Sequence, residues 1–157
     1  MEQQRDGLVL STDPEQMDVE AIHKYLSEES YWARGIPLGV VERALANSLC
    51  FGVFDGGRQV ALARVVTDLA TYAYLCDVYV LESHRRRGIG HWMLEAIDSH
   101  PDLQGLRRWS LITRDAHSLY EPHGYIPLAK PENYLERVYR DVYVRGTAHS
   151  AGGDAPE

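Results

Sequence analysis

The chain has 157 residues, of which 45% are hydrophobic, and its formal net charge is −7 with a pI near 5.5. A chain of this length can bury one substantial core but hardly two. Its acidic balance argues against sequence-independent binding of nucleic acid, which needs a basic face. No apolar run of about 18 residues is present to span a membrane. Residues 1–6 lack the apolar stretch of a signal peptide, so we expect a cytoplasmic protein.

The first third of the chain predicts a short strand and two helices. Residues 8–10 are apolar and strand-like. Asp18 can cap a helix whose apolar positions recur every three to four residues. The aromatic run that follows interrupts this pattern, and Pro37 suits the first turn of a second helix.

The rest of the chain predicts a sheet with further helices. Residues 49–54 and 59–67 flank the turn sequence Asp-Gly-Gly-Arg, which is a strong hairpin signal. Another strand runs from about residue 73 to residue 80. The chain then alternates helix, strand and helix, and it closes with strand-like residues 125–128 and 137–143. This order predicts an α/β fold in which helices flank a central mixed β-sheet on both faces.

We expect residues 1–144 to form a single domain. Residues 145–157 are mostly small or polar, which predicts a disordered C-terminal tail. Cys50 and Cys76 lie in apolar strand-like runs and are expected to be small core residues rather than disulfide partners. The seven histidines show neither an i, i+4 pair on one helix nor a cysteine at ligand spacing, so no metal site is predicted.

A basic loop with two glycines follows the strand that ends near Val80. Gly88 and Gly90 let the backbone turn tightly and approach a ligand closely. Helical periodicity begins at Ile89, so the loop ends at a helix N-terminus, whose unpaired N–H groups attract anions. The arginines at 85–87 add positive potential. The pattern predicts a pyrophosphate site, although a solvated surface turn is the plain alternative; the lysine of a Walker loop and the third glycine of a dinucleotide fingerprint are both missing.

Two motifs together resemble one family. Arg85-x-x-Gly88-x-Gly90 after a strand resembles the acetyl-CoA loop of the GCN5-related N-acetyltransferase (GNAT) family. Residues 109–113 then predict a buried strand, and the run Leu-Tyr-Glu-Pro-His-Gly-Tyr from Leu119 resembles the family's Leu-Tyr-Glu-x-x-Gly-Phe/Tyr signature. The resemblance covers roughly residues 49–128 and implies a GNAT-like fold. It also implies direct, ternary-complex transfer of an acetyl group from acetyl-CoA to a primary amine of a small molecule or peptide.

The resemblance carries a set of site residues with it. It implies that acetyl-CoA is held by Val78, Tyr79, Val80, Arg85, Arg86, Arg87, Gly88, Ile89, Gly90 and His91. Tyr120 occupies the general-acid position, with a core tyrosine as the alternative. Asp77 is the catalytic candidate for the base, because many members carry Glu-Asp where this chain has Cys76-Asp77; a carboxylate paired with an arginine is the alternative. Alternation along the strand places Cys76, Val78 and Val80 on one face and Asp77 and Tyr79 on the other. The missing glutamate leaves His84, His117 and a water relay open as other bases.

The family binds its acceptor with the first two helices, their connection and the last strands. Tyr31, Trp32 and Arg34 are therefore the substrate-binding candidates, and Tyr134 and Tyr139 belong to the same region. An aromatic cluster suits a cationic or flat amine through cation–π contact. It equally suits a hydrophobic lid or a homodimer interface, and the sequence leaves these alternatives open.

Two departures from the family pattern keep a second function open. Asp115 stands where the family frequently has an asparagine that contacts the cofactor, and we expect this aspartate to cap the following helix instead. The missing glutamate at Cys76 favours a catalytically silent CoA-binding module that senses acyl-CoA or mediates assembly. Tyr120 and the intact glycine loop favour the enzyme.

Overall fold

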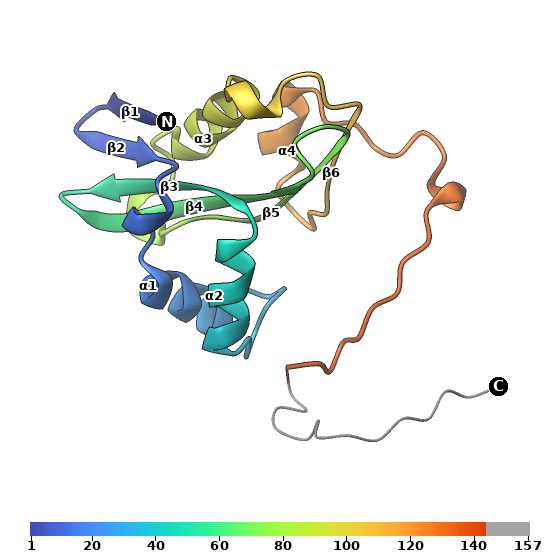
Figure 1. Ribbon diagram of the computed structural model, residues 1–157, viewed down its shortest axis with the longest axis horizontal. Coiled ribbons are helices and arrows are strands. Elements are labelled where there is room, and N and C mark those ends of the chain that lie inside the picture. The colour runs from blue at the N-terminus through green and yellow to red at the C-terminus, as the bar shows by residue number, and fades with distance from the viewer. Residues whose placement is uncertain (144–157) are drawn as a thin grey trace.

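A six-stranded mixed sheet forms the centre of the molecule (Figure 1). The computed structural model describes residues 1–143, and the predicted disordered tail at 145–157 lies outside the described residues. The strands follow one another in the sheet in chain order: β1 (Glu2–Arg5), β2 (Leu8–Ser11), β3 (Leu49–Asp55), β4 (Arg58–Thr67), β5 (Tyr72–Val80) and β6 (Arg108–Leu111). Neighbours from β1 to β5 are antiparallel, and β6 runs parallel to β5.

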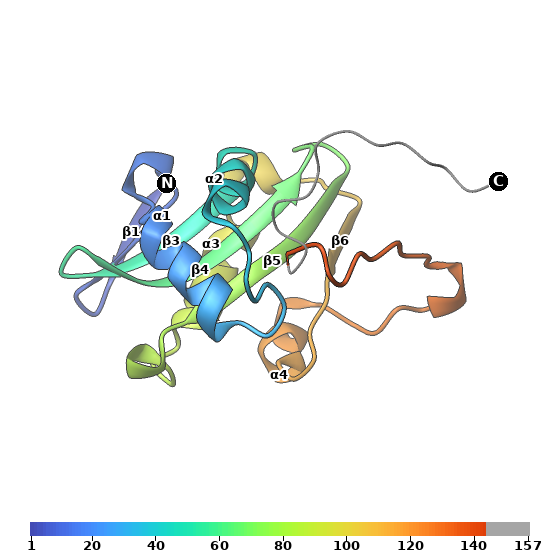
Figure 2. The same ribbon diagram turned by 90° about the horizontal axis from the view of Figure 1, so that it is seen from below.

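Helices cover both faces of this sheet. On one face lie α1 (Val19–Lys24), a π-helical turn (Tyr25–Glu29) and α2 (Leu38–Ala46) (Figure 2). On the other face lie α3 (Ile89–Asp98) and α4 (His117–Tyr120). The predicted mixed sheet with helices on both faces is confirmed.

Each face of the sheet has its own hydrophobic core, because successive strand residues point to opposite sides. On the α3 face, Phe51 packs in one cluster with Trp92. On the α1–α2 face, Leu62 packs in a second cluster with Ile22 and Val41. All five side chains are buried, so the two cores fix the helices against the sheet that carries the site.

The helix cap and the hairpin turn that the sequence predicts are present in the structure. The Asp18 carboxylate accepts a hydrogen bond from the Ala21 amide at 2.9 Å and caps α1. Pro37 directly precedes α2. The β3–β4 hairpin turns at Gly56 and Gly57, whose φ angles of 55° and 85° are the left-handed values that favour glycine.

Two parts of the fold differ from the sequence prediction. Strand β1 was not expected, because its residues Glu-Gln-Gln-Arg lack apolar alternation; it forms by pairing with β2 across a turn at Asp6 and Gly7. The strands predicted at 125–128 and 137–143 are wrong: residues 124–143 contain no strand, and their local structure is a short 3₁₀ turn at Pro131–Asn133 and a turn at residues 140–143. A strand-like sequence forms a strand only where a neighbour offers backbone partners.

Within residues 1–143, no helix has both the length and the apolar character needed to cross a membrane.

Candidate active site

Strand β5 carries a β-bulge at its centre. Its register with β4 passes from Leu62 opposite Tyr79 to Arg64 opposite Cys76, so β5 contains one extra residue at this point. Asp77 has a φ of +49°, a left-handed value that aspartate tolerates better than most residues. A bulge bends its strand and redirects the neighbouring groups, and such bulges are common beside active sites.

The bulge shifts the alternation of side chains along β5. Leu75 before the bulge and Val78 and Val80 after it all pack against the core on the α3 face. Simple alternation predicts that Cys76 shares a face with Val78 and Val80. That prediction is wrong for Cys76, because the extra residue changes the phase between positions 75 and 78.

Two pockets lie where β5 and β6 stop pairing. The two strands pair only from Tyr72 to Leu75 on β5, opposite Arg108 to Leu111 on β6. Beyond that point lie pockets of about 470 Å³ and about 250 Å³, which we call the main pocket and the side pocket. The residues that line both are Tyr31, Trp32, Val78, Asp115, Ala116 and Tyr120.

Tyr120 stands at the junction of these two pockets. It is the last residue of α4, and its side chain packs into the core of the α3 face with 8% exposure. Burial raises the pKa of the Tyr120 phenol to about 12, with smaller contributions from Tyr31 and Asp115. Among the described residues its hydroxyl has no hydrogen-bond partner. A neutral phenol is therefore available to a ligand in either pocket.

Eight of the ten predicted acetyl-CoA residues fall into two groups in space. Five line the main pocket together with Tyr120: Val78, Tyr79, Val80, Arg85 and Gly90. Three line a separate pocket of about 270 Å³ on the other side of the loop: Arg87, Gly88 and Ile89. Arg86 lines neither pocket, and His91 lies 3.2 Å from the ring of His123 instead.

The glycine loop leads into α3 as the sequence indicates. The Arg85 guanidinium donates to the Val80 carbonyl at 3.0 Å and so ties the start of the loop to the end of β5. Gly88 then caps α3 with a φ of +75°. A Cβ added at Gly90 would lie 3.1 Å from Leu119 Cδ1, so this glycine also lets α3 pack closely against α4. Free amides at the start of a ten-residue helix, beside arginines, fit the pyrophosphate of CoA.

Asp77 is held between two donors. Its Oδ2 accepts from Arg64 Nε at 2.7 Å, and its Oδ1 accepts from Trp32 Nε1 at 2.8 Å. The side chains of Arg64 and Asp77 are only 16% and 11% exposed. Burial alone would lower the pKa of the Arg64 guanidinium, yet the Asp77 carboxylate keeps it above its ordinary value. A base role for Asp77 stays a prediction, and its two partners favour a role in positioning Trp32.

The loop after the π-helical turn forms an aromatic wall over both pockets. The rings of Tyr31 and Trp32 meet edge to face with centroids 5.0 Å apart. The Arg114 guanidinium lies 3.8 Å above the Tyr31 ring and links this loop to the segment after β6. Of the other predicted acceptor residues, Arg34 is exposed and lines neither pocket, and Tyr139 is 70% exposed on the C-terminal segment.

Sequence reasoning missed the two residues of the main pocket that come from the π-helical turn, Tyr25 and Glu29. Tyr25 stacks on Tyr79 with ring centroids 3.8 Å apart and an interplanar angle of 12°. Glu29 lines the same pocket, and no hydrogen bond or ion pair to its carboxylate is found within residues 1–143. Both belong to the π-helical turn, a rare element that often marks functional sites. The break in helical periodicity before Tyr31 was the available signal.

Asp115 and His84 do not take the roles that the sequence suggests for them. Asp115 does not cap α4, because the helix begins at His117 and Ala116 is the cap; the Ala116 amide donates to Thr113 Oγ1 at 3.0 Å. The predicted aspartate cap is therefore wrong. His84 lies 2.9 Å from an Asp55 oxygen on the β3–β4 hairpin and lines neither pocket at Tyr120.

Cys76 is poorly suited to a covalent role in the site. Burial raises the pKa of the Cys76 thiol to about 12, which disfavours the thiolate that a nucleophile needs. In the part of the chain that the structure describes, no group of three or more His, Cys, Asp or Glu side chains could hold a metal ion.

Comparison with known proteins places this site in a family. A family model described as an acetyltransferase (GNAT) domain matches residues 46–127, which contain β5, the glycine loop and Tyr120. A protein of Gibberella zeae whose name describes it as an acetyltransferase, FG08082, is 35% identical over 138 residues, covering 74% of this chain and 77% of its own. The chain belongs to the GNAT acetyltransferase family.

Solved structures agree with this assignment. A crystal structure of a protein assigned to the GNAT family from Xanthomonas campestris pv. campestris is 48% identical, with a TM-score of 0.86. The match covers 89% of this GNAT chain and 99% of that one. A predicted acetyltransferase from Clostridium acetobutylicum, described with acetyl-CoA, shares the fold alone: it is 13% identical with a TM-score of 0.61, covering 83% of this chain and 96% of its own.

Proposed function

We propose that this GNAT protein transfers an acetyl group from acetyl-CoA to a primary amine of a small molecule or peptide, in one direct step. The observation that carries the proposal is Tyr120: the residue lines both pockets, burial raises the pKa of its phenol to about 12, and no hydrogen-bond partner of its hydroxyl is found among residues 1–143. A silent CoA-binding module would have no use for a proton donor at this position. The cytoplasm, where we expect the protein, is part of the same proposal.

Acetyl-CoA, when bound, supplies the acetyl group as a thioester. We assign its pyrophosphate to the amides at the start of α3, and its extended arm to the backbone of Val78 and Val80. Val78 follows the bulge and lines both pockets, and we assign its backbone N–H to the carbonyl oxygen of the thioester, which this donor would polarise. The Tyr120 hydroxyl can then donate a proton to the departing sulfur.

The acceptor amine is assigned to the side of the site under Tyr31 and Trp32. The aromatic faces of both residues line the two pockets, and Glu29 and Asp115 supply carboxylates to the main pocket. Such surroundings favour a cationic amine over an anionic one. We propose that the Glu29 carboxylate pairs with the positive charge of the incoming amine. Asp77 is the candidate for the base.

Gly88→Ala tests the pyrophosphate site, and we expect it to weaken acetyl-CoA binding by about tenfold or more. A side chain at a φ of +75° strains the loop and displaces amides that bind charged oxygens, and each such hydrogen bond contributes about 1.5–3 kcal/mol. Gly105→Ala is the matched control, because Gly105 has the same φ, equally open surroundings and no place in the site. Calorimetry that finds equal Kd values for the two variants would remove the loop from the binding site.

Cys76→Ala tests direct transfer, and we expect it to keep most of the activity. The raised pKa of this thiol leaves little thiolate at neutral pH, so no acetyl-cysteine should form. Mass spectrometry of the intact protein during turnover reads this directly. An adduct of one acetyl group on Cys76 that decays when the amine is added would replace direct transfer by a two-step route.

A further inference from the structure

The side pocket beside Tyr120 lies on the α1–α2 face of the sheet. Ala73 and Leu75 of β5 pack in the core of the α3 face. Because successive strand residues point to opposite sides, Tyr74 and Cys76 point to the α1–α2 face, and both line the side pocket. The pocket therefore begins at the site of acetyl transfer and follows β5 away from it.

Tyr74 sets the length of the side pocket. Of the β5 residues that line the pocket, Tyr74 lies farthest from Val78, whose amide we assign to the thioester carbonyl. Their separation of four residues is at most roughly 13 Å, because a strand rises about 3.3 Å per residue. This length suits a compact group on a short chain that ends in the reacting amine.

The side pocket also limits the bulk of its occupant. Its volume is about 250 Å³. An apolar cavity of about 150 Å³ is enough to hold a benzene ring. The side pocket therefore has room for one ring with a short chain, and a second fused ring would overfill it.

One wall of the side pocket is aromatic, open to solvent and held in place. The side chains of Tyr31 and Trp32 are 48% and 41% exposed, although both are large and apolar. The bond to Asp77 fixes the Trp32 indole, and the Arg114 guanidinium lies 3.8 Å from the centre of the Tyr31 ring. Aromatic rings attract one another in stacked and edge-to-face contacts, so a flat ring in the pocket would cover a preorganised wall.

Both carboxylates that line the side pocket already have basic partners. Asp77 accepts from Arg64 Nε at 2.7 Å and from Trp32 Nε1 at 2.8 Å. Asp115 Oδ2 lies 3.5 Å from Arg114 Nη2. A second ammonium group in this pocket would have to displace these partners or stay unpaired, and both are unfavourable. The pocket therefore favours an acceptor whose body is neutral.

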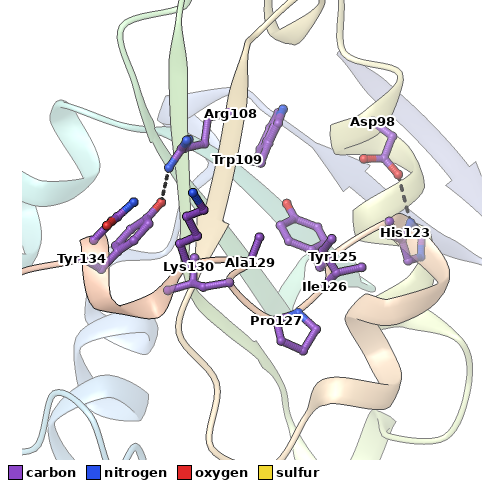
Figure 3. A pocket seen from close by; sticks show the side chains of 13 residues that line it. Asp98, Arg108, Trp109, His123, Tyr125, Ile126, Pro127, Ala129, Lys130 and Tyr134 are labelled. Atoms are coloured by element: carbon purple, nitrogen blue, oxygen red, sulfur yellow. Dashed lines mark hydrogen bonds and ion pairs between the residues drawn. The ribbon is translucent and has the colours of Figure 1, made fainter.

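A larger hollow beside β6 is a poorer site for the acceptor. Its volume is about 680 Å³, but Tyr120 does not line it (Figure 3). Two basic side chains do, Arg108 and Lys130. The carboxylate that lines it, Asp98, lies 2.9 Å from His123 Nδ1. A cationic amine is therefore better placed at the side pocket.

We propose, on the basis of the acetyl transfer proposed above, that the acceptor is a primary monoamine whose body is a single flat apolar ring on a short chain. The ring lies in the side pocket against Trp32, with Tyr74 at its far end, and the amine reaches the junction with the main pocket. The amine nitrogen forms the new C–N bond as the C–S bond of acetyl-CoA breaks. One proton leaves the nitrogen for the base, and Tyr120 protonates the departing sulfur.

A panel of four primary amines tests this substrate class: phenethylamine, butylamine, putrescine and naphthylethylamine, each assayed for release of CoA thiol. We expect kcat/KM for phenethylamine to exceed the other three values by about tenfold or more, which is the usual discrimination of an apolar pocket. Equal or higher values for butylamine or putrescine would overturn the ring class and leave acetyl transfer standing.

Calorimetry separates the substrate class from the proposed transfer. The protein, saturated with CoA, is titrated with the same amines, and we expect phenethylamine to bind about tenfold or more tightly than butylamine or putrescine. That preference without thiol release in the assay would keep the substrate class and remove acetyl transfer. Equal affinities for all four amines would overturn the class whether or not thiol is released.

Tyr74→Ala tests whether the side pocket selects the acceptor by size. Removing the ring lengthens the pocket, so we expect the ratio of kcat/KM for phenethylamine to that for naphthylethylamine to fall by about tenfold or more. A general loss of stability would lower both values alike. Tyr72→Ala is the matched control and should keep the natural ratio, because Tyr72 lies on the same strand and lines neither the main nor the side pocket. A natural ratio in Tyr74→Ala as well would place the body of the acceptor outside the side pocket and overturn the proposal.

Discussion

Tyr120→Phe is expected to lower kcat by about 10²–10⁴-fold while acetyl-CoA affinity stays nearly unchanged, which is the usual size of a general-acid contribution. Phenylalanine keeps the ring in the core of the α3 face and removes only the hydroxyl, which has no hydrogen-bond partner in the described chain. Stopped-flow assays of thiol release and calorimetry of acetyl-CoA binding give the two quantities separately.

Tyr125→Phe is the matched control for this experiment. Tyr125 lies beside Tyr120, with ring centroids 5.9 Å apart, and burial likewise raises the pKa of its phenol. Tyr125 lines neither the main pocket nor the side pocket, so the kcat of this variant should stay within a few-fold of that of the natural protein. Equal losses in the two variants would show that the hydroxyls act through packing.

The pH dependence of the activity tests the acid role of Tyr120 in a second way. Because burial raises the pKa of Tyr120 to about 12, the acid form persists well above the ordinary tyrosine pKa of about 10. The natural protein should therefore lose no activity through this group up to about pH 10, and the decline should begin only as the pH approaches 12. An alkaline limb centred near pH 8 that vanishes in the Phe variant would contradict the burial argument.

Asp77→Ala is expected to destabilise the fold by about 3–5 kcal/mol, the usual effect of breaking a buried ion pair. The variant leaves the Arg64 guanidinium, 16% exposed, without its carboxylate partner, and frees the Trp32 indole. Urea unfolding measures the loss. The double variant Arg64→Met/Asp77→Ala should recover part of it, because no unpaired charge remains. If the single variant is as stable as the natural protein, the ion pair does not hold this part of the sheet.

Asp77→Asn separates positioning from base catalysis. Asparagine tolerates the left-handed backbone but cannot take a proton at neutral pH, and its amide nitrogen replaces one of the two oxygens that accept from Trp32 and Arg64. If Asp77 positions the aromatic wall, KM for the amine rises, kcat changes little and the acidic limb of the pH profile stays. Loss of that limb with a drop in kcat of about 10²–10⁴-fold would make Asp77 the base. Glu29→Gln, tested alongside, shows whether the missed carboxylate carries that limb.

The sequence predicts those parts of the site that are contiguous in the chain. The β5 strand, the glycine loop and the start of α3 follow one another within residues 72–98, and each is marked by a local signal. Tyr120 was found in the same way, from the run around it. Local signals also predicted the Asp18 cap and the β3–β4 hairpin.

The parts that were missed depend on contacts between distant residues. The bond from Trp32 to Asp77 joins residues 45 positions apart, and the bulge that permits it appears only in the register of β5 against β4. Alternation along β5 alone could not reveal it. Residues 137–143 have the composition of a strand, yet composition does not say whether a neighbouring strand edge is available to pair with them.

Release of free CoA thiol from acetyl-CoA, followed across a panel of cationic and neutral primary amines, tests acetyl transfer itself. We expect release that depends on the amine, an acetylated amine of matching amount by mass spectrometry, and a loss of about 10²–10⁴-fold in Tyr120→Phe. Tight binding of acetyl-CoA without amine-dependent release for any member of the panel would contradict acetyl transfer and identify the protein as a CoA-binding module.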